Sequence, residues 1–204
     1  WVRLDYTAEF DSHVLHGEGN AVQNVIYVNS DGNVGIGGIP SSEITDDLTV
    51  SGNVVFKGST MLSDADLNVS GTGPRMIWYP KKSAFRAGYV DNDEWDDANI
   101  GYNSIVFGYS GLVDSDNSAI VGGKNNQILS ASSTASDGSD GSVIVGGYTN
   151  SIQNSPYSTI IGGGSSTNQG NTIADSTYST IIGGHSHSMS NSTYSTIVGG
   201  YSNT

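Results

Sequence analysis

The sequence predicts an all-β chain in which short strands lead into a parallel β-solenoid with coils of about 16 residues. Three observations predict this fold. Among 204 residues, 28 are glycine and only 13% are charged, a composition that favours strands and turns over helices. A short motif recurs through the C-terminal half, and every copy carries two adjacent apolar residues. Together these features indicate a long object with a thin core.

Residues 1–72 are expected to form a β-rich shaft region. Brief apolar segments are separated there by Gly, Pro and Asn-containing turns, and no helical period is visible. The segments are Asn24–Val28, Asp31–Pro40 and Leu48–Phe56.

Residues 73–100 are expected to form an aromatic and basic junction that seals the open end of the solenoid. Its aromatic and basic residues are Trp78, Tyr79, Phe85 and Trp95 with Arg75, Lys81, Lys82 and Arg86. Ion pairs with the acidic run Asp91–Asp97 are the expected role of the cations. An anionic-glycan site is the alternative.

Residues 101–204 contain the repeats. A coil of about 16 residues with two insertions explains the spacing of the repeated serines, which are Ser104, Ser118, Ser142, Ser158, Ser179 and Ser195. Each coil is expected to hold two short strands, because a second apolar segment follows at a fixed offset, at Ile128, Ile152 and Met189. The Gly-Gly pairs allow positive φ at corners, and Asn and Ser are expected to close turns through their own side chains.

Both faces of the first strand in each coil are predicted to be apolar. The adjacent pairs are Val106/Phe107, Ile120/Val121, Ile144/Val145, Ile160/Ile161, Ile181/Ile182 and Ile197/Val198. Neighbouring side chains on a strand point to opposite faces, so one residue of each pair fills the coil and the other adds to an apolar stripe. Such a stripe predicts self-association.

The repeats from Ile100 to Thr204, with their N-S-x-x-x-G pattern, resemble the left-handed parallel β-roll of the YadA-like trimeric adhesin head. They depart from that family in the two insertions and in Gly-Gly where a single Gly is usual. Residues 32–40 and 48–54 resemble an element in the shafts of phage tail fibres, especially those of marine and cyanobacterial phages. The combined resemblance implies a fibrous homotrimer.

The resemblance also implies a function, that of a bacteriophage tail-fibre subunit that mediates attachment to the host surface. Its implied location is the virion or, otherwise, the cell exterior, and its implied partners are other tail proteins and a host cell-surface glycan or protein. A bacterial trimeric autotransporter-type adhesin head is one alternative, and a tail-spike glycan depolymerase is another. Receptor contacts are expected in the two insertions, at Ser136, Asp137, Ser139, Asp140, Ser165, Ser166, Thr167, Asn168 and Gln169.

Charge and motif content argue against several other classes. The net charge is −13, and neither Lys nor Arg follows Lys124, which disfavours nucleic acid and anionic membranes as partners. We expect no membrane insertion, since no apolar run is long enough to cross a bilayer. We expect no catalytic residue, since the repeats hold few carboxylates and lack a G-x-S-x-G elbow.

His185 and His187 are the most interesting candidates for a metal site. Residues i and i+2 on a strand share a face, so three copies would offer six imidazoles to one ion on the trimer axis. However, these histidines align with Lys124 and Asn126 of an earlier coil, positions expected to face solvent. No cofactor is therefore predicted.

Overall fold

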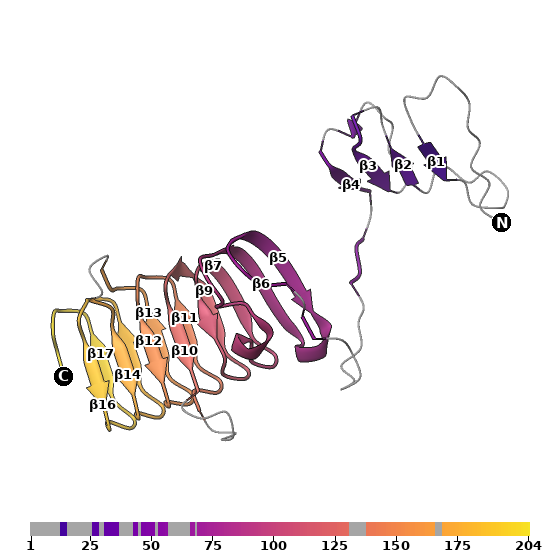
Figure 1. Cartoon of the computed structure of the whole chain (residues 1–204). Helices are drawn as coiled ribbons and strands as arrows, with labels where there is room; N and C mark the ends of the chain where they lie inside the picture. The colour runs from indigo at the N-terminus through magenta and orange to yellow at the C-terminus, as the bar shows by residue number, and fades with distance from the viewer. Residues whose placement is uncertain are drawn as a thin grey trace. The chain divides into compact units, whose positions relative to one another are not determined.

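The structure is a computed structural model, and it describes residues 13–15, 26–28, 31–36, 43–44, 46–51, 53–56, 66–67, 69–130, 138–165 and 169–204. The chain divides into two compact units, Trp1–Phe56 and Lys57–Thr204 (Figure 1). Over the described residues the secondary structure consists of strands and a few 3-10 turns. The predicted all-β class is confirmed.

The first unit holds four strands of three residues in the order β1-β2-β3-β4. They are β1 (His13–Leu15), β2 (Ile26–Val28), β3 (Val34–Ile36) and β4 (Leu48–Val50). Strand β2 is antiparallel to both β1 and β3, whereas β3 and β4 are parallel. Strands β2 to β4 lie within the predicted apolar segments, whereas residues 54–56 form no strand and are exposed.

The second unit begins with an antiparallel hairpin. Its strands are β5 (Gly73–Tyr79) and β6 (Ala84–Val90), and the 3-10 helix η2 (Pro80–Lys82) joins them. Strand β6 then pairs in parallel with β7 (Ile105–Tyr109). The hairpin therefore covers the edge of the first coil strand, an edge that would otherwise be open to pairing with another chain.

From β7 onward the chain alternates between two parallel sheets (Figure 1). The large sheet has the order β17-β15-β13-β11-β9-β7-β6-β5, and the small sheet has the order β16-β14-β12-β10-β8. The remaining strands are β8 (Leu112–Val113), β9 (Ala119–Lys124), β10 (Gln127–Leu129), β11 (Val143–Val145), β12 (Ser151–Gln153), β13 (Thr159–Ile161), β14 (Thr172–Ala174), β15 (Thr180–Ile182), β16 (Ser188–Ser190) and β17 (Thr196–Val198).

The core of the coils is two stacks of apolar side chains, one from each sheet. In the large sheet Ile144 pairs with Ile120 and Ile160, so equivalent residues lie directly above one another. The fully or almost fully buried members are Val106, Ile120, Ile144, Ile160 and Ile181 in the large sheet, and Val113, Ile128, Ile152, Ile173 and Met189 in the small sheet. The first member of each predicted apolar pair thus fills the interior, except that Ile197 is only partly buried.

Serine side chains connect each coil to the next. Ser158 is fully buried; its Oγ accepts the backbone N–H of Ser179 at 3.1 Å and donates to the carbonyl of Ser176 at 2.9 Å. The same N–H to Oγ bond recurs along the stack at Ser118, Ser142 and Ser179, and a second serine stack follows the small-sheet strands at Ser139, Ser155 and Ser176. These buried hydroxyls satisfy backbone groups that no strand neighbour reaches.

An asparagine ladder also connects successive coils, at the opposite corner. Asn150 Oδ1 accepts the N–H of Asn171 at 2.9 Å, and Asn150 Nδ2 donates to the carbonyls of Gly162 and Gly163 at 3.3 Å. Asn and Ser were expected to close turns through their own side chains. In the structure their main bonds run between coils.

The second glycine of each corner is required by close packing. Gly147 has φ 86°, and a Cβ at this position would lie 2.4 Å from the carbonyl oxygen of Gly163 in the next coil. No L side chain fits there without moving the backbone. The predicted positive φ at the Gly-Gly corners is confirmed.

Arg86 plugs the end of the core, which corrects its expected role as an ion-pairing cation. It is fully buried, and its register places it between Ile77 and Val106. Its guanidinium donates to the carbonyl and Oγ of Ser104, at 2.9 and 2.8 Å, and to the carbonyl of Val113 at 3.2 Å. Burial lowers the pKa of Arg86 to about 10. The strand alternation, rather than the charge pattern, determines where this side chain lies.

Candidate functional site

The most extensive candidate surface is the outward side of the large sheet, here called the outer face. It is built from the second member of each apolar pair, namely Phe107, Val121, Val145, Ile161, Ile182 and Val198. These side chains keep 40–47% of their surface exposed, and Val198 keeps 72%. Each pairs in register with the next, so they form one unbroken apolar row across the coils.

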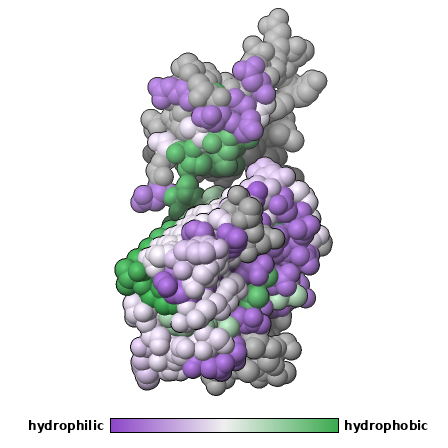
Figure 2. All heavy atoms as spheres, turned by 90° about the vertical axis from the view of Figure 1, so that its left-hand side faces the viewer, coloured by the Kyte–Doolittle hydropathy of each residue, from purple (hydrophilic) through white to green (hydrophobic). Residues whose placement is uncertain are grey.

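The apolar row continues across the hairpin. Met76 and Ala87 pair with each other, and Ala87 pairs with Phe107 of the first coil. Beside them, Trp78 is 41% exposed and lies next to Phe85 in register. In Figure 2, hydrophobic residues gather along one side of the coil-bearing unit, against a largely neutral or polar surface. An apolar surface of this length is unusual for a protein that stays monomeric.

A row of stacked tyrosines borders the outer face where the strands begin. The rings of Tyr157, Tyr178 and Tyr194 are 5.2 and 5.1 Å apart between centroids, and their planes differ by 10° and 1°. All three residues adopt a left-handed conformation, with φ of 57–60°. Asn117 and Gly141 hold the equivalent position in earlier coils, and those residue types adopt this conformation at lower cost.

A second row borders the outer face where the strands end. Tyr89 and Tyr109 stack at 5.0 Å, and the ammonium of Lys124 lies 4.2 Å from the centroid of the Tyr109 ring and 5.9 Å from that of Tyr148. Further along, the ring centroids of His185 and Tyr201 lie 4.6 Å apart. The outer face is thus an apolar strip edged on both sides by aromatic side chains, a composition typical of protein interfaces.

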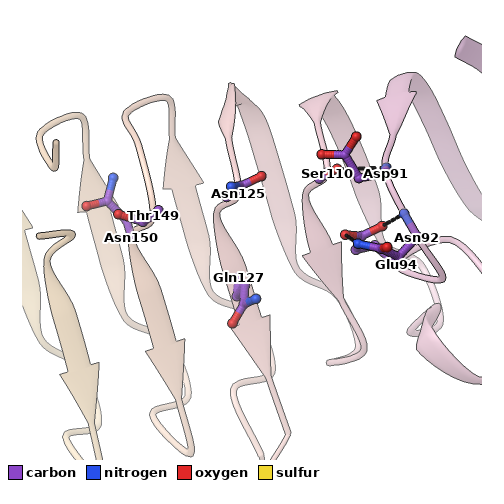
Figure 3. Close-up of a pocket in the computed structure, with 8 residues that line it drawn as sticks. All are labelled: Asp91, Asn92, Glu94, Ser110, Asn125, Gln127, Thr149 and Asn150. Atoms are coloured by element: carbon purple, nitrogen blue, oxygen red, sulfur yellow. Dashed lines mark hydrogen bonds between the residues drawn. The ribbon is translucent and has the colours of Figure 1, made fainter. Parts of the chain in front are cut away.

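A polar groove lies at the corner between the two sheets (Figure 3). Its volume is about 330 Å³. Ser110, Asn125 and Thr149 follow the ends of successive large-sheet strands and line one side of the groove (Figure 3). The other lining residues are Asp91, Asn92, Glu94, Gln127 and Asn150. No residue of the outer face lines the groove.

Hydrogen bonds hold the acidic side of the groove in place. Asp91 Oδ1 accepts the Tyr109 hydroxyl at 2.7 Å, and the Asp91 N–H donates to Ser110 Oγ at 2.9 Å. Glu94 Oε2 accepts the N–H of Asn92 at 2.9 Å. The bond to the Asp91 carboxylate, together with partial burial, raises the pKa of Tyr109 to about 12. This part of the groove is therefore formed before any ligand arrives.

No family model, curated protein or solved structure matches the chain. The outer face and the groove are therefore the basis for a functional assignment. Over the residues that the structure describes, no helix is long and apolar enough to cross a membrane.

The histidine pair differs from the sequence-based expectation. His187 was expected to face solvent, but it is 1% exposed and occupies a rung of the asparagine ladder. The backbone N–H of His187 donates to Asn171 Oδ1 at 3.1 Å, and the ring Nδ1 of His187 accepts the backbone N–H of Asn203 at 3.1 Å. His185 is half-buried beside Tyr201. The alignment of His187 with Asn126 was right, but Asn126 is itself fully buried, because both residues lie at a corner where the side chain turns inward.

The receptor-loop candidates are only partly within the described residues. Ser136, Asp137, Ser166, Thr167 and Asn168 lie outside them. Of the others, Gln169 is exposed, and Asp140 accepts the N–H of Asp116 at 3.0 Å. Ser139 is fully buried and belongs to the second serine stack, where its Oγ donates to the carbonyl of Leu129 at 2.8 Å. Ser139 is therefore a structural residue and is not accessible to a receptor.

Two cations of the junction form ion pairs. Lys82 Nζ lies 3.5 Å from Oδ1 of Asp97, a member of the predicted acidic run, whereas Lys81 pairs with Asp66 outside that run. The hydroxyl of Tyr79 also donates to Asp97 at 2.5 Å, and burial, with that bond, raises the pKa of Tyr79 to about 12. In the described part of the chain, no group of three or more His, Asp or Glu side chains gathers around a common point suited to a metal ion.

Proposed function

We propose that the chain is one subunit of a homotrimeric fibre on a bacteriophage tail, where it attaches the virion to the host surface without catalysing a reaction. The observation that carries the proposal is the outer face, an apolar row that crosses every coil and the hairpin. Covering it in a trimer removes an apolar surface that would otherwise cause non-specific association.

The repeat of the outer face favours further copies of this chain as the occupants. Equivalent side chains recur once per coil, at the spacing of neighbouring strands, about 4.8 Å. A second copy carries the same repeat, so its side chains can interlock coil by coil along the whole row, while an unrelated partner would lack this match. The resemblance to trimeric β-roll heads supports three copies.

In this proposal attachment depends on valency. Three chains per fibre and several fibres per virion present many identical sites to a host cell-surface glycan or protein, and weak contacts then give firm binding. Other tail proteins of the virion are the remaining expected partners.

Assembly is tested by sedimentation of the wild-type chain and two variants. Ile161→Asp places a carboxylate in the middle of the outer face and is expected to convert the trimer to a folded monomer, because a buried unpaired charge is strongly unfavourable. The matched control is Gln153→Asp, an exposed position on the small sheet, and it should remain trimeric. A folded wild-type monomer at micromolar concentration would refute the assembly.

A second candidate, a glycan depolymerase, is favoured by one observation. Asp91 and Glu94 line the same groove, and glycosidases use a pair of carboxylates. Both are already hydrogen-bonded, to Tyr109 and to Asn92. We expect no release of reducing ends when purified protein is incubated with bacterial capsule or lipopolysaccharide. Release that is lost in Glu94→Gln would assign the groove to catalysis and overturn the non-enzymatic function.

A further inference from the structure

We propose that the polar groove is a binding site for an uncharged or N-acetylated saccharide. This inference rests on the proposed attachment function and names the ligand class and the residues that recognise it. It moves recognition from the two insertions to the corner between the sheets.

The groove presents hydrogen-bonding groups suited to sugar hydroxyls. The side-chain amides of Asn125 and Gln127 have no hydrogen-bond partner among the described residues, and each offers both donors and an acceptor. Ser110 Oγ accepts one bond from the Asp91 N–H and can still donate its own proton. A sugar hydroxyl donates and accepts at once, so mixed amides and hydroxyls complement it better than carboxylates alone would.

The arrangement of these groups fits an extended ligand better than a single ion. Ser110, Asn125 and Thr149 occupy the corner after successive strands, so they repeat at the strand spacing of about 4.8 Å. The volume of about 330 Å³ is that of a small-molecule pocket and far exceeds the space of one coordinated cation. The polar groups line the groove along its length.

Charge selects the class of sugar. Asp91 and Glu94 both line the groove, and the chain as a whole has a net charge of −13. A uronate or sialate would bring a further negative charge beside these carboxylates, which is unfavourable. Lys124 does not line the groove, and its ammonium lies over the ring of Tyr109. An uncharged polyol or acetamido sugar meets no such repulsion.

The proposed trimer interface, the outer face, does not include the groove. Its residues come from the loop after β6, from the corners and from the small sheet, whereas the outer face belongs to the large sheet. Assembly and ligand binding therefore use different side chains, and each fibre would display three equivalent grooves.

The test uses the full chain and three defined tetrasaccharides, maltotetraose, chitotetraose and tetragalacturonate. Saturation-transfer NMR detects binding, and calorimetry measures the affinity. We expect weak binding of at least one of the two uncharged sugars and none of tetragalacturonate. Gln127→Ala removes one free amide and should weaken binding about fivefold. The control Gln153→Ala makes the same change at an exposed small-sheet position outside the groove and should bind as the wild type does.

Several outcomes would overturn the proposal. They are binding of neither uncharged sugar, equal affinity of Gln127→Ala and the wild type, and preference for tetragalacturonate. Titration with Ca²⁺ alone is a further arm. Calcium binding that is lost in Glu94→Gln, in a protein that binds no sugar, would reassign the groove as a cation site.

The result is separable from the proposed function. If the wild type is trimeric and binds whole host cells but binds neither uncharged tetrasaccharide, the saccharide site is wrong and attachment uses another surface. If the wild type binds a tetrasaccharide in the groove but is monomeric and binds no cells, the fibre function is wrong while the site stands.

Discussion

Removal of one buried hydroxyl, by Ser158→Ala, tests whether the serine stacks hold the coils together. Ser158 is fully buried; its Oγ accepts the N–H of Ser179 and donates to the carbonyl of Ser176, with the carbonyl of Pro156 a longer second acceptor at 3.4 Å. Alanine fits the same space and suits the backbone. The substitution therefore isolates the hydroxyl and changes little else.

The magnitude follows from the two bonds that are lost. Without Oγ, the N–H of Ser179 and the carbonyl of Ser176 lose a partner inside the coil. A buried group left unsatisfied costs about 1–3 kcal/mol, and a carbonyl tolerates the loss better than an N–H. We therefore expect the free energy of unfolding to fall by about 2–4 kcal/mol.

Urea denaturation measures the total effect, and amide hydrogen exchange locates it. Exchange at Ser179 should accelerate most, because its N–H is the orphaned donor. Ser188→Ala is the matched control, since Ser188 is an exposed serine on β16, and it should change stability by less than about 0.5 kcal/mol.

A Ser158→Ala protein with wild-type stability and unchanged exchange at Ser179 would refute this reasoning. The intercoil bonds would then be incidental, and the apolar stacks alone would hold the coils in register.

Three further predictions concern other buried polar groups. His187→Asn should raise the free energy of unfolding by about 1 kcal/mol. His187 Nε2 is buried without a partner, whereas asparagine elsewhere in the ladder donates to glycine carbonyls. A lower urea midpoint for the variant would contradict this prediction. Arg86→Lys should cost about 2 kcal/mol or more, since an ammonium cannot reproduce the bonds of the guanidinium to Ser104 and Val113; an unchanged thermal midpoint would contradict it. Burial raises the pKa of Asp114 above 3.8, so the folded state binds this proton more tightly than the unfolded state does, and the group costs stability as pH rises through that window. Asp114→Asn should therefore be more stable than the wild type at pH 7 and equal to it near pH 3, and a gain that is the same at both pH values would contradict the assignment.

The strand pattern of the repeats was predictable because alternation is a local property of the chain. The adjacent apolar residues at 160 and 161 had to point to opposite faces, and the structure buries Ile160 and exposes Ile161. The second strand of each coil was predictable for the same reason, and Ile128 and Ile152 are buried as their spacing indicated.

The corners were less predictable because their hydrogen bonds join residues that are distant in sequence. Asn side chains were expected to close turns locally, yet Asn150 Oδ1 accepts the N–H of Asn171, 21 positions away. His187 and Ser139 were misplaced for this reason, since each replaces or extends a ladder that only the stacked coils create. The register between coils would have to be known before the hydrogen bonds at the corners could be predicted.

The candidate site was the least accessible to sequence reasoning. Asp91 follows the hairpin and Gln127 lies in a coil, and the two share no motif, so only the stacking brings them to one groove. One signal was available, namely that residues 110, 125 and 149 each follow a strand and repeat once per coil. Aligning the polar residues that follow each strand would have indicated a polar edge.

The ladder bonds also bear on how such a chain can change in length. In both ladders the serine or asparagine oxygen accepts the backbone N–H of the equivalent residue in the next coil. Every junction between coils therefore has nearly the same chemistry, and a whole coil can be duplicated or lost without creating a new kind of interface. Gain or loss of one coil therefore changes the length of the solenoid by one strand spacing, about 4.8 Å. The hairpin with Arg86 and the rows of the outer face keep their register.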